Sequence, residues 1–182
     1  MKTPELSTPR LHLRPVHADD AAPIFSCWMN DPTVSRYMYW DASDDPHDAE
    51  EFVRFELDNV ENDDWNRWII ELRQTGAIIG TCLIFRNEAE QSWDVSYNLG
   101  RRYWGNGYAA EAMRCAMDFA VRKLGLRTCI ADYAADNPAS GRMLAKLGFA
   151  FEREIPFECG NGMRTIGRRC RLTIPTKGVH VP

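Results

Sequence analysis

The spacing of apolar and polar residues along the chain predicts short strands separated by helices. The clearest strand covers residues 92–99, in which Val95, Tyr97 and Leu99 alternate strictly with polar neighbours. Strands are also predicted at 10–15, 68–72, 77–85, 127–134, 149–157 and 165–174. Apolar residues at helical spacing predict helices at 19–29, 47–60, 107–124 and 137–147, with a helical turn at 33–37. Asn137-Pro138 would begin the last helix, with Asn137 as its cap.

The order of these elements indicates how the strands pair. Short turns such as Gln74-Thr75-Gly76 join successive strands, which predicts antiparallel hairpins. The strands at 92–99 and 127–134 instead flank a helix, so a right-handed crossover would make them parallel. The chain has 182 residues, of which 45% are hydrophobic and 26% charged, and this suits one domain with a sizeable core. We therefore expect a single mixed α/β (α+β) domain over 1–182, with a folded core at about 8–174 and a frayed tail at 175–182.

The bulk chemistry argues against several classes of protein. A net charge of −4 and a pI near 5.6 argue against nucleic acid as a default partner. No apolar run approaches ~18 residues and no apolar segment follows the N-terminus, so we expect a cytoplasmic protein without a membrane span. The six cysteines lack C-x-x-C spacing and the four histidines lack H-x-x-x-H spacing. We expect reduced core cysteines and no metal site.

Acidic residues are concentrated at positions 41–64, where eleven carboxylates accompany one arginine. Two interpretations stay open at this point. The stretch could form a solvated helix face, or it could form an acidic rim that raises the local concentration of a cationic substrate.

A stretch with two glycines near the middle of the chain carries the strongest chemical signal. It reads Arg101-Arg102-Tyr103-Trp104-Gly105-Asn106-Gly107-Tyr108-Ala109 and lies between the strand at 92–99 and the helix that follows. Backbone N–H groups at a helix N-terminus bind phosphate, and glycines remove the Cβ atoms that would hold a ligand away. The sequence therefore predicts a phosphate-binding loop.

A dinucleotide is one ligand that such a loop could bind. Gly105-x-Gly107-x-x-Ala110 matches the dinucleotide fingerprint, and Asp132 follows about twenty residues on. In a Rossmann fold, however, the first glycine follows its strand almost at once and several βαβ units follow. Here residues 100–104 separate strand from glycine, the preceding strands form hairpins, and one βαβ unit is legible. These features favour a different phosphate-bearing ligand.

A wider set of motifs extends from this loop across nearly the whole chain. Arg102-x-x-Gly105-x-Gly107 resembles the pyrophosphate-binding signature of the GNAT superfamily, the acetyl-CoA-dependent N-acetyltransferases, and residues 103–112 resemble its RimJ/RimL branch. Further segments similar to that branch occur in the expected order: Arg10-Leu11-His12-Leu13-Arg14-Pro15, Asn30-Asp31-Pro32, Ile79-Gly80-Thr81, Asn137-x-x-Ser140 and Lys146-Leu147-Gly148-Phe149.

The resemblance implies acetyl-CoA as the cofactor and a set of residues that bind it. The pyrophosphate would lie on the loop, and the pantetheine arm would pair like an extra strand with the end of segment 92–99, where it splays from the strand at 127–134. Backbone N–H groups near Asn98 and Leu99 would also polarise the thioester carbonyl. The implied cofactor-binding residues are Asn98, Leu99, Arg102, Trp104, Gly105, Asn106, Gly107, Tyr108, Ala109 and Asn137.

The implied reaction is direct attack of a primary amine on the acetyl thioester, and two residues are candidates for its proton chemistry. Asp94 stands where many relatives carry glutamate; it would act as the base through a water molecule, or alternatively would only orient a partner. Many superfamily members use a tyrosine as the acid, and this chain has Leu144 at that position. Ser140 matches the serine proposed to contact the thioester sulfur in the Rim-type branch, unless its hydroxyl only bonds to the helix backbone.

The acceptor is less well defined. Tyr37, Tyr39, Trp40 and residues 157–162 stand where relatives place acceptor contacts, and aromatic rings with carboxylates would suit an ammonium group. A protein N-terminal α-amine and a small-molecule amine both stay open as acceptors, with the protein as a monomer or a homodimer. Because Leu144 replaces the tyrosine, a non-catalytic acyl-CoA-binding sensor or partner-binding module is the alternative function.

Overall fold

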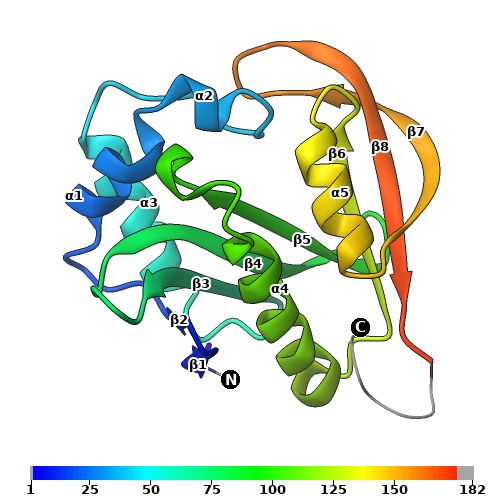
Figure 1. Ribbon diagram of the computed structural model, residues 1–182, viewed down its shortest axis with the longest axis horizontal. Helices are drawn as coiled ribbons and strands as arrows, with labels where there is room; N and C mark the ends of the chain where they lie inside the picture. The colour runs from blue at the N-terminus through cyan, green and yellow to red at the C-terminus, as the bar shows by residue number, and fades with distance from the viewer. Residues whose placement is uncertain (1, 176–182) are drawn as a thin grey trace.

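The structure is a computed structural model that describes residues 2–175, built around one eight-stranded sheet (Figure 1). The strands are β1 (Leu6–Ser7), β2 (Leu11–Arg14), β3 (Trp65–Leu72), β4 (Ile78–Asn87), β5 (Ser92–Leu99), β6 (Thr128–Ala134), β7 (Ala150–Glu158) and β8 (Arg164–Thr173). They lie in the order β1-β2-β3-β4-β5-β6-β8-β7, and every neighbouring pair is antiparallel except β5 and β6. The predicted, mostly antiparallel sheet is confirmed. Beyond Pro175, the predicted frayed tail lies outside the described residues.

The parallel strands β5 and β6 are paired over a very short length. Trp93 lies opposite Cys129 and Asp94 opposite Ile130, and beyond these two pairs the strands separate. Figure 1 shows the two strands diverging from this point. β5 stays paired with β4 as far as Leu99, so its other edge has no strand partner after Asp94 within the described chain. The predicted splay is confirmed, and it leaves backbone groups that an extended, amide-rich ligand can bind.

The helices are shorter and less regular than the apolar spacing predicts. They are α1 (Ala21–Ile24), α2 (Pro32–Ser35), α3 (His47–Asp58), α4 (Tyr108–Phe119) and α5 (Pro138–Lys146). The predicted helix 19–29 is wrong in detail, because α1 continues as a π-helical turn at Phe25–Met29, and α4 likewise ends in a π-helical turn at Ala120–Leu124. Apolar spacing does not distinguish these geometries, since both keep the same face toward the core.

Two strand predictions also need correction. The short strand β1 was not predicted, because two residues are too few to show an alternating pattern. β3 begins at Trp65, three residues before the predicted start at Trp68. Asn66 and Arg67 interrupt the apolar run there, although Asn66 is buried in the fold.

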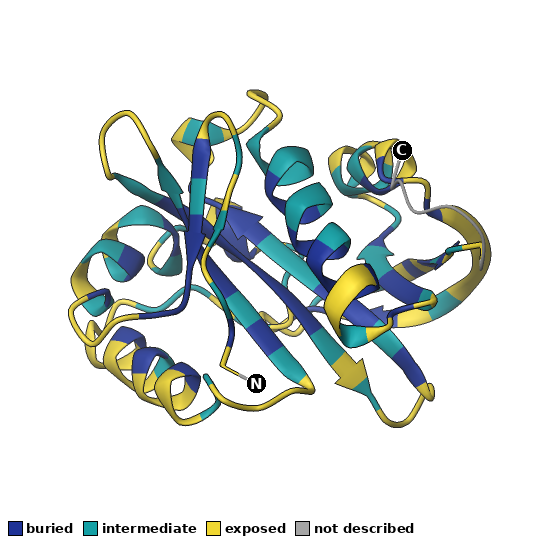
Figure 2. Ribbon diagram, turned by 90° about the horizontal axis from the view of Figure 1, so that it is seen from below, coloured by how far each residue is buried: buried dark blue, intermediate teal, exposed yellow. Residues whose placement is uncertain are grey.

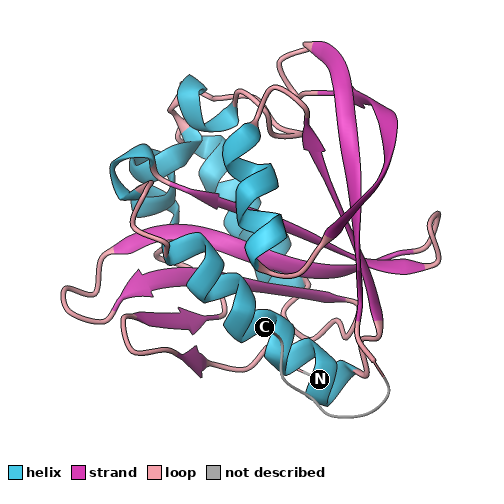
Figure 3. Cartoon of the chain, turned by 45° about the vertical axis from the view of Figure 1, so that its right-hand side comes forward, coloured by secondary structure: helices cyan, strands magenta, loops and turns pink. Residues whose placement is uncertain are grey.

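The sheet separates two apolar cores. One face packs against α4 and α5, with Trp68, Met113 and Met117 fully buried, and Figure 3 shows these two helices on the same side of the sheet. The other face packs against α1 and α3 through Ile24, Val53 and other side chains. Figure 2 shows buried residues along the central strands and the inner sides of the helices.

The cysteines are all free thiols, as predicted. Cys82, Cys129, Cys159 and Cys170 are buried, whereas Cys27 and Cys115 are half-buried. Four of the six cysteines therefore lie in the core, as predicted, and two do not.

Gly80 allows β4 and β5 to approach closely at the end of the splayed strand. A Cβ at this position would lie 2.2 Å from the Asn98 carbonyl oxygen and 2.6 Å from Leu99 Cδ2. We expect Gly80→Ala to destabilise the protein by about 1–3 kcal/mol, because the added methyl forces the strands apart. The measurement is the urea midpoint of unfolding, and an unchanged midpoint would show that the strands have room to move.

Candidate active site

The loop between β5 and α4 presents backbone N–H groups at the start of a helix. Gly107 is the N-cap residue of α4, and both Gly105 and Gly107 have a φ of +78°. This left-handed conformation suits glycine, and a Cβ at Gly105 would meet no atom within 4 Å. No side chain of the described residues caps the first turn of α4. The N–H groups at the positive end of the helix dipole are therefore available to an anion, and they fit the pyrophosphate of acetyl-CoA.

The side chain of Arg10, in the turn between β1 and β2, contacts this loop. Its Nη1 donates a hydrogen bond to the carbonyl oxygen of Asn106 at 3.1 Å, and its Nε donates to Glu111 Oε2 at 2.6 Å. The guanidinium carbon lies 4.6 Å from the centre of the Tyr108 ring. Arg10, paired with Glu111 of the first turn of α4, is therefore held beside the predicted phosphate-binding turn. Arg10 was not predicted as a site residue, because 96 residues separate it from Asn106 and no local pattern links them.

Trp104 and Asn106 fix the shape of the loop through their side chains. Trp104 Nε1 donates to the carbonyl oxygen of Leu99 at 2.8 Å, which ties the loop to the end of β5. Asn106 Nδ2 donates to the carbonyl oxygens of Tyr103 and Trp104 at 3.2 and 3.0 Å. The Trp104 ring stays 47% exposed. Both residues thus hold the backbone that the sequence predicts to face phosphate.

The other predicted loop residues flank the two glycines. Arg102 is exposed in the 3₁₀ turn Arg101–Tyr103, with its guanidinium carbon 4.8 Å from the centre of the Tyr103 ring. Tyr108 and Ala109 form the first turn of α4. Their backbone belongs to the same loop-to-helix stretch as the glycines, and their contact with the cofactor stays a prediction.

The end of β5 combines an unpaired strand edge with a buried amide. Asn98 pairs with Thr81 and Leu99 with Gly80 on the β4 side. Asn98 is 7% exposed, and its Nδ2 has no hydrogen-bond partner within the described residues. A buried amide nitrogen without a hydrogen-bond partner lowers the stability of the fold, unless a ligand or a water molecule accepts its hydrogen bond. The feature agrees with the predicted binding of a polar ligand at Asn98 and Leu99.

The start of α5 brings Asn137 and Ser140 to the diverging strands. Asn137 is the N-cap residue, and its side chain accepts a hydrogen bond from the Ser140 N–H at 3.3 Å, so its predicted capping role is confirmed. The Ser140 hydroxyl does not bond to the helix backbone; its oxygen lies 2.5 Å from the hydroxyl oxygen of Tyr97 on β5. Leu144 is 1% exposed and belongs to the core. The serine hydroxyl is thus held between β5 and α5.

Asp94 lies at the point where β5 and β6 begin to diverge. Its Oδ2 accepts a hydrogen bond from Asn87 Nδ2 at 3.1 Å, and its Oδ1 accepts from the Val95 N–H at 2.7 Å. The residue is 9% exposed. Burial raises the pKa of Asp94 to about 6, with a smaller contribution in the same direction from Asp132, although both hydrogen bonds favour the charged form. A carboxylate with this pKa can take up and release protons near neutral pH.

Two segments of the predicted acceptor side lie close to Asp94. The rings of Tyr39 and Phe157 lie 5.0 Å apart, and the Gly160 N–H donates to the carbonyl oxygen of Met38 at 2.9 Å. Partial desolvation of the phenol raises the pKa of Tyr39, and the nearby charges of Asp132 and Asp94 raise it further, while the residue as a whole is 64% exposed. The loop after α2 and the β7–β8 turn therefore come together over the polar face of β5.

One buried arginine links the carboxylates on this side. Arg169 is 6% exposed and donates two hydrogen bonds to Asp132, at 2.9 and 2.7 Å. Its Nη1 also lies 2.5 Å from Glu90 Oε1. Asp132 and Glu90 thus share the Arg169 guanidinium, and Glu90 also lies 3.8 Å from Arg153 Nη2. The Arg169 charge opposes the rise in the pKa of Asp94 without a direct ion pair between the two. The sequence pattern did not predict this cluster, because its members come from separate strands and a turn.

The family is established by comparison with known proteins. The family model described as acetyltransferase (GNAT) domain matches residues 10–150. This chain belongs to the GNAT acetyltransferase family. It is also 31% identical to "Uncharacterized N-acetyltransferase p20" of Bacillus licheniformis over 148 residues, which cover 81% of this chain and 83% of that protein.

Solved structures of GNAT proteins share the fold. A putative ribosomal-protein-serine acetyltransferase from Vibrio cholerae superposes with a TM-score of 0.81 at 23% identity, covering 96% of this chain and all of that one. RimL, a ribosomal L7/L12 α-N-protein acetyltransferase in complex with coenzyme A, gives a TM-score of 0.83 at 14% identity, covering 94% and 98% of the two chains. At these identities, the likeness shows that the three proteins share one fold.

GNAT membership decides between the two ligands considered for the glycine loop. The chain is an acyltransferase with acetyl-CoA as the donor. The dinucleotide interpretation is wrong, because the sheet contains one parallel pair and Asp132, the residue that would bind a ribose, is paired with Arg169.

The acidic stretch at 41–64 lies largely on the surface of the protein. Ten of its eleven acidic residues are exposed, and the exception, Glu56, is buried and forms an ion pair with Arg67 across 2.5 Å. Both a solvated helix face and an acidic rim would be exposed, so the two interpretations stay open. Asp41, at the start of the stretch, lies beside Gly160 of the β7–β8 turn.

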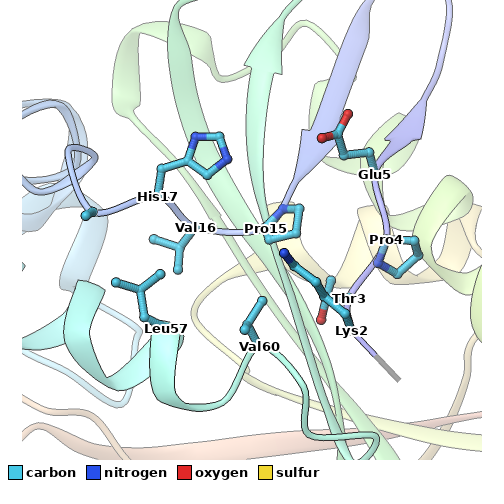
Figure 4. A pocket seen from close by; sticks show the side chains of 10 residues that line it. Lys2, Thr3, Pro4, Glu5, Pro15, Val16, His17, Leu57 and Val60 are labelled. Carbon is cyan, nitrogen blue, oxygen red and sulfur yellow. The ribbon is translucent and has the colours of Figure 1, made fainter.

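A separate cavity of about 540 Å³ lies away from the GNAT site. Figure 4 shows it between the N-terminal segment, the chain after β2 and the end of α3. Its lining, residues 2–5 and 15–18 with Leu57 and Val60, includes no residue predicted to bind cofactor or amine. Among residues 2–175, no helix is long and apolar enough to cross a membrane.

Proposed function

We propose that this GNAT protein transfers the acetyl group of acetyl-CoA directly to a primary amine that carries further positive charge. The observation that carries the proposal is the arrangement along β5. A glycine loop suited to pyrophosphate follows one end of the strand, and the buried carboxylate of Asp94 lies where the strand separates from β6. The unpaired edge between them offers backbone groups for the pantetheine arm.

In the proposed reaction, each part of the site has a separate task. Backbone N–H groups near Asn98 and Leu99 polarise the thioester carbonyl. Asp94, in its ionised form, accepts a proton from the attacking amine through water, since a protonated amine has no lone pair with which to attack. The Ser140 hydroxyl lies on the α5 side of the splay and donates a hydrogen bond to the departing sulfur.

The charge around Asp94 supports a cationic acceptor. Asp132 and Glu90 are paired with Arg169, Asp94 lies close enough for the Asp132 charge to raise its pKa, and the ring of Tyr39 adds an aromatic face beside them. A second ammonium group on the acceptor would find both partners here. Polyamines and aminoglycosides have this chemistry, and a peptide with a basic residue after its free α-amine also fits.

The proposed function is tested with a panel of amines assayed for free thiol and, by mass spectrometry, for the acetylated product. The panel contains polyamines, aminoglycosides and peptides that differ in their first residues. We expect acetylation of cationic acceptors, with one thiol released for each amide formed. Tight binding of acetyl-CoA without turnover on any amine would contradict the proposal and favour an acyl-CoA sensor.

A further inference from the structure

The hydroxyl groups of Tyr97 and Ser140 form a pair across the two sides of the splay. Tyr97 is on β5, Ser140 is on α5, and their oxygens are 2.5 Å apart. Within the described chain, Ser140 Oγ is the only hydrogen-bond partner of the Tyr97 hydroxyl. The pair is formed by residues 43 positions apart, so no sequence motif contains both.

The direction of this hydrogen bond follows from the chemistry of the two groups. A phenol is a stronger acid than an alkyl alcohol and is therefore the better donor. Burial raises the pKa of Tyr97 to about 12, against the opposing effect of its hydrogen bond with Ser140, so the phenol keeps its proton at neutral pH. With Tyr97 as the donor, Ser140 Oγ is the acceptor, and the serine hydrogen is left to point elsewhere.

We propose that Tyr97 is a positioning residue, which donates to Ser140 and thereby directs the Ser140 hydroxyl hydrogen at the thioester sulfur. The proposal rests on the function proposed above and adds a residue to it. Asn137 fixes the serine backbone through its capping bond, and Tyr97 fixes the side chain. Since Leu144 supplies no phenol from α5, the tyrosine hydroxyl of this site comes from β5 and acts through the serine.

The bonds and protons of the acetyl transfer define the role of each residue. The amine nitrogen forms a bond to the acetyl carbon as the carbon–sulfur bond breaks, and the electron pair of that bond stays on sulfur. Before attack, the ammonium form of the amine loses one proton through water to Asp94, which passes it to solvent. After the carbon–nitrogen bond forms, the second proton leaves the nitrogen by the same route. The Ser140 O–H stabilises the sulfur anion by a hydrogen bond, and the released thiolate takes its proton from solvent. Tyr97 therefore keeps its own proton throughout and acts by orientation.

The test is a double-mutant cycle with Tyr97→Phe, Ser140→Ala and the combined variant, assayed for thiol release with the best acceptor. Tyr133→Phe is the matched control, because its hydroxyl packs beside Gly141 on the same helix and forms no hydrogen bond within the described residues. Titration of each variant with acetyl-CoA measures binding, and a thermal melt checks folding. Ser140→Thr keeps a hydroxyl and serves as a second background, into which Tyr97→Phe is also introduced.

We expect Tyr97→Phe to lower kcat by about tenfold while the Kd for acetyl-CoA stays unchanged, the size typical of one hydrogen bond. The same change should have no further effect in the Ser140→Ala background and should lower kcat again in the Ser140→Thr background. Tyr133→Phe should behave as wild type.

Three outcomes would overturn the inference. A Tyr97→Phe variant with wild-type kcat, a loss that adds fully to that of Ser140→Ala, or an equal loss in Tyr133→Phe would each show that Tyr97 does not act through Ser140. Absence of turnover in the wild-type protein would be a different result, because it overturns the proposed function and this inference with it.

Discussion

Gly107→Glu is expected to abolish acetyl-CoA binding, with Kd raised by more than about 100-fold. The variant places a carboxylate at the N-cap of α4, among the N–H groups that are proposed to hold the pyrophosphate. Like charges brought together in a binding site cost several kcal/mol, which corresponds to at least this change in affinity. Isothermal titration with acetyl-CoA measures the effect.

Gly125→Glu is the matched control for this variant. Gly125 also has positive φ, +69°, and a Cβ there meets no atom within 4 Å, but it lies beyond the opposite end of the same helical segment. Both variants therefore introduce the same backbone strain and the same charge. Loss of binding in Gly107→Glu alone supports the loop assignment, whereas equal affinities in the two variants would remove it.

Asp94→Asn is expected to lower kcat by about 10²–10⁴-fold, the usual contribution of a general base. The asparagine keeps the shape of the side chain and cannot take a proton, so acetyl-CoA affinity should change little. Steady-state kinetics with the best acceptor measure the loss. Wild-type kcat in this variant would show that Asp94 only orients its neighbours.

The pH dependence gives an independent test of the role of Asp94. Its carboxyl pKa is raised to about 6, chiefly by burial, so the active carboxylate form is lost as pH falls through about 6. The wild-type profile of kcat/KM should therefore show an acid limb near pH 6, and Asp94→Asn should lack it and follow the pKa of the amine at higher pH. Asp132→Asn should move the limb to lower pH, because the Asp132 charge helps to raise the pKa of Asp94. If the acid limb near pH 6 persists in Asp94→Asn, a group other than Asp94 is responsible for it.

The local features of the fold could be predicted from the sequence. The alternation in β5 and the glycines at 105 and 107 predicted a strand followed by a glycine turn and a helix start, and the structure shows this arrangement. Asn137-Pro138 correctly predicted the cap of α5. These predictions succeed because each depends on residues within a few positions of one another.

The features that were not predicted depend on contacts between distant segments. Arg10 reaches the glycine loop from the β1–β2 turn, and Tyr97 reaches Ser140 across the splay. In the pattern of β5, Tyr97 is only one more apolar position, and nothing local distinguishes it from Val95. Strand registers decide these contacts, and a single sequence does not specify them.

The central claim is that the loop at Gly105 and Gly107 holds acetyl-CoA. Isothermal titration of the wild-type protein with acetyl-CoA and, separately, with NAD tests it most directly. We predict saturable binding of acetyl-CoA at one site per chain and no heat of binding with NAD at the same concentrations. Absence of acetyl-CoA binding, or binding of NAD in its place, would contradict the account.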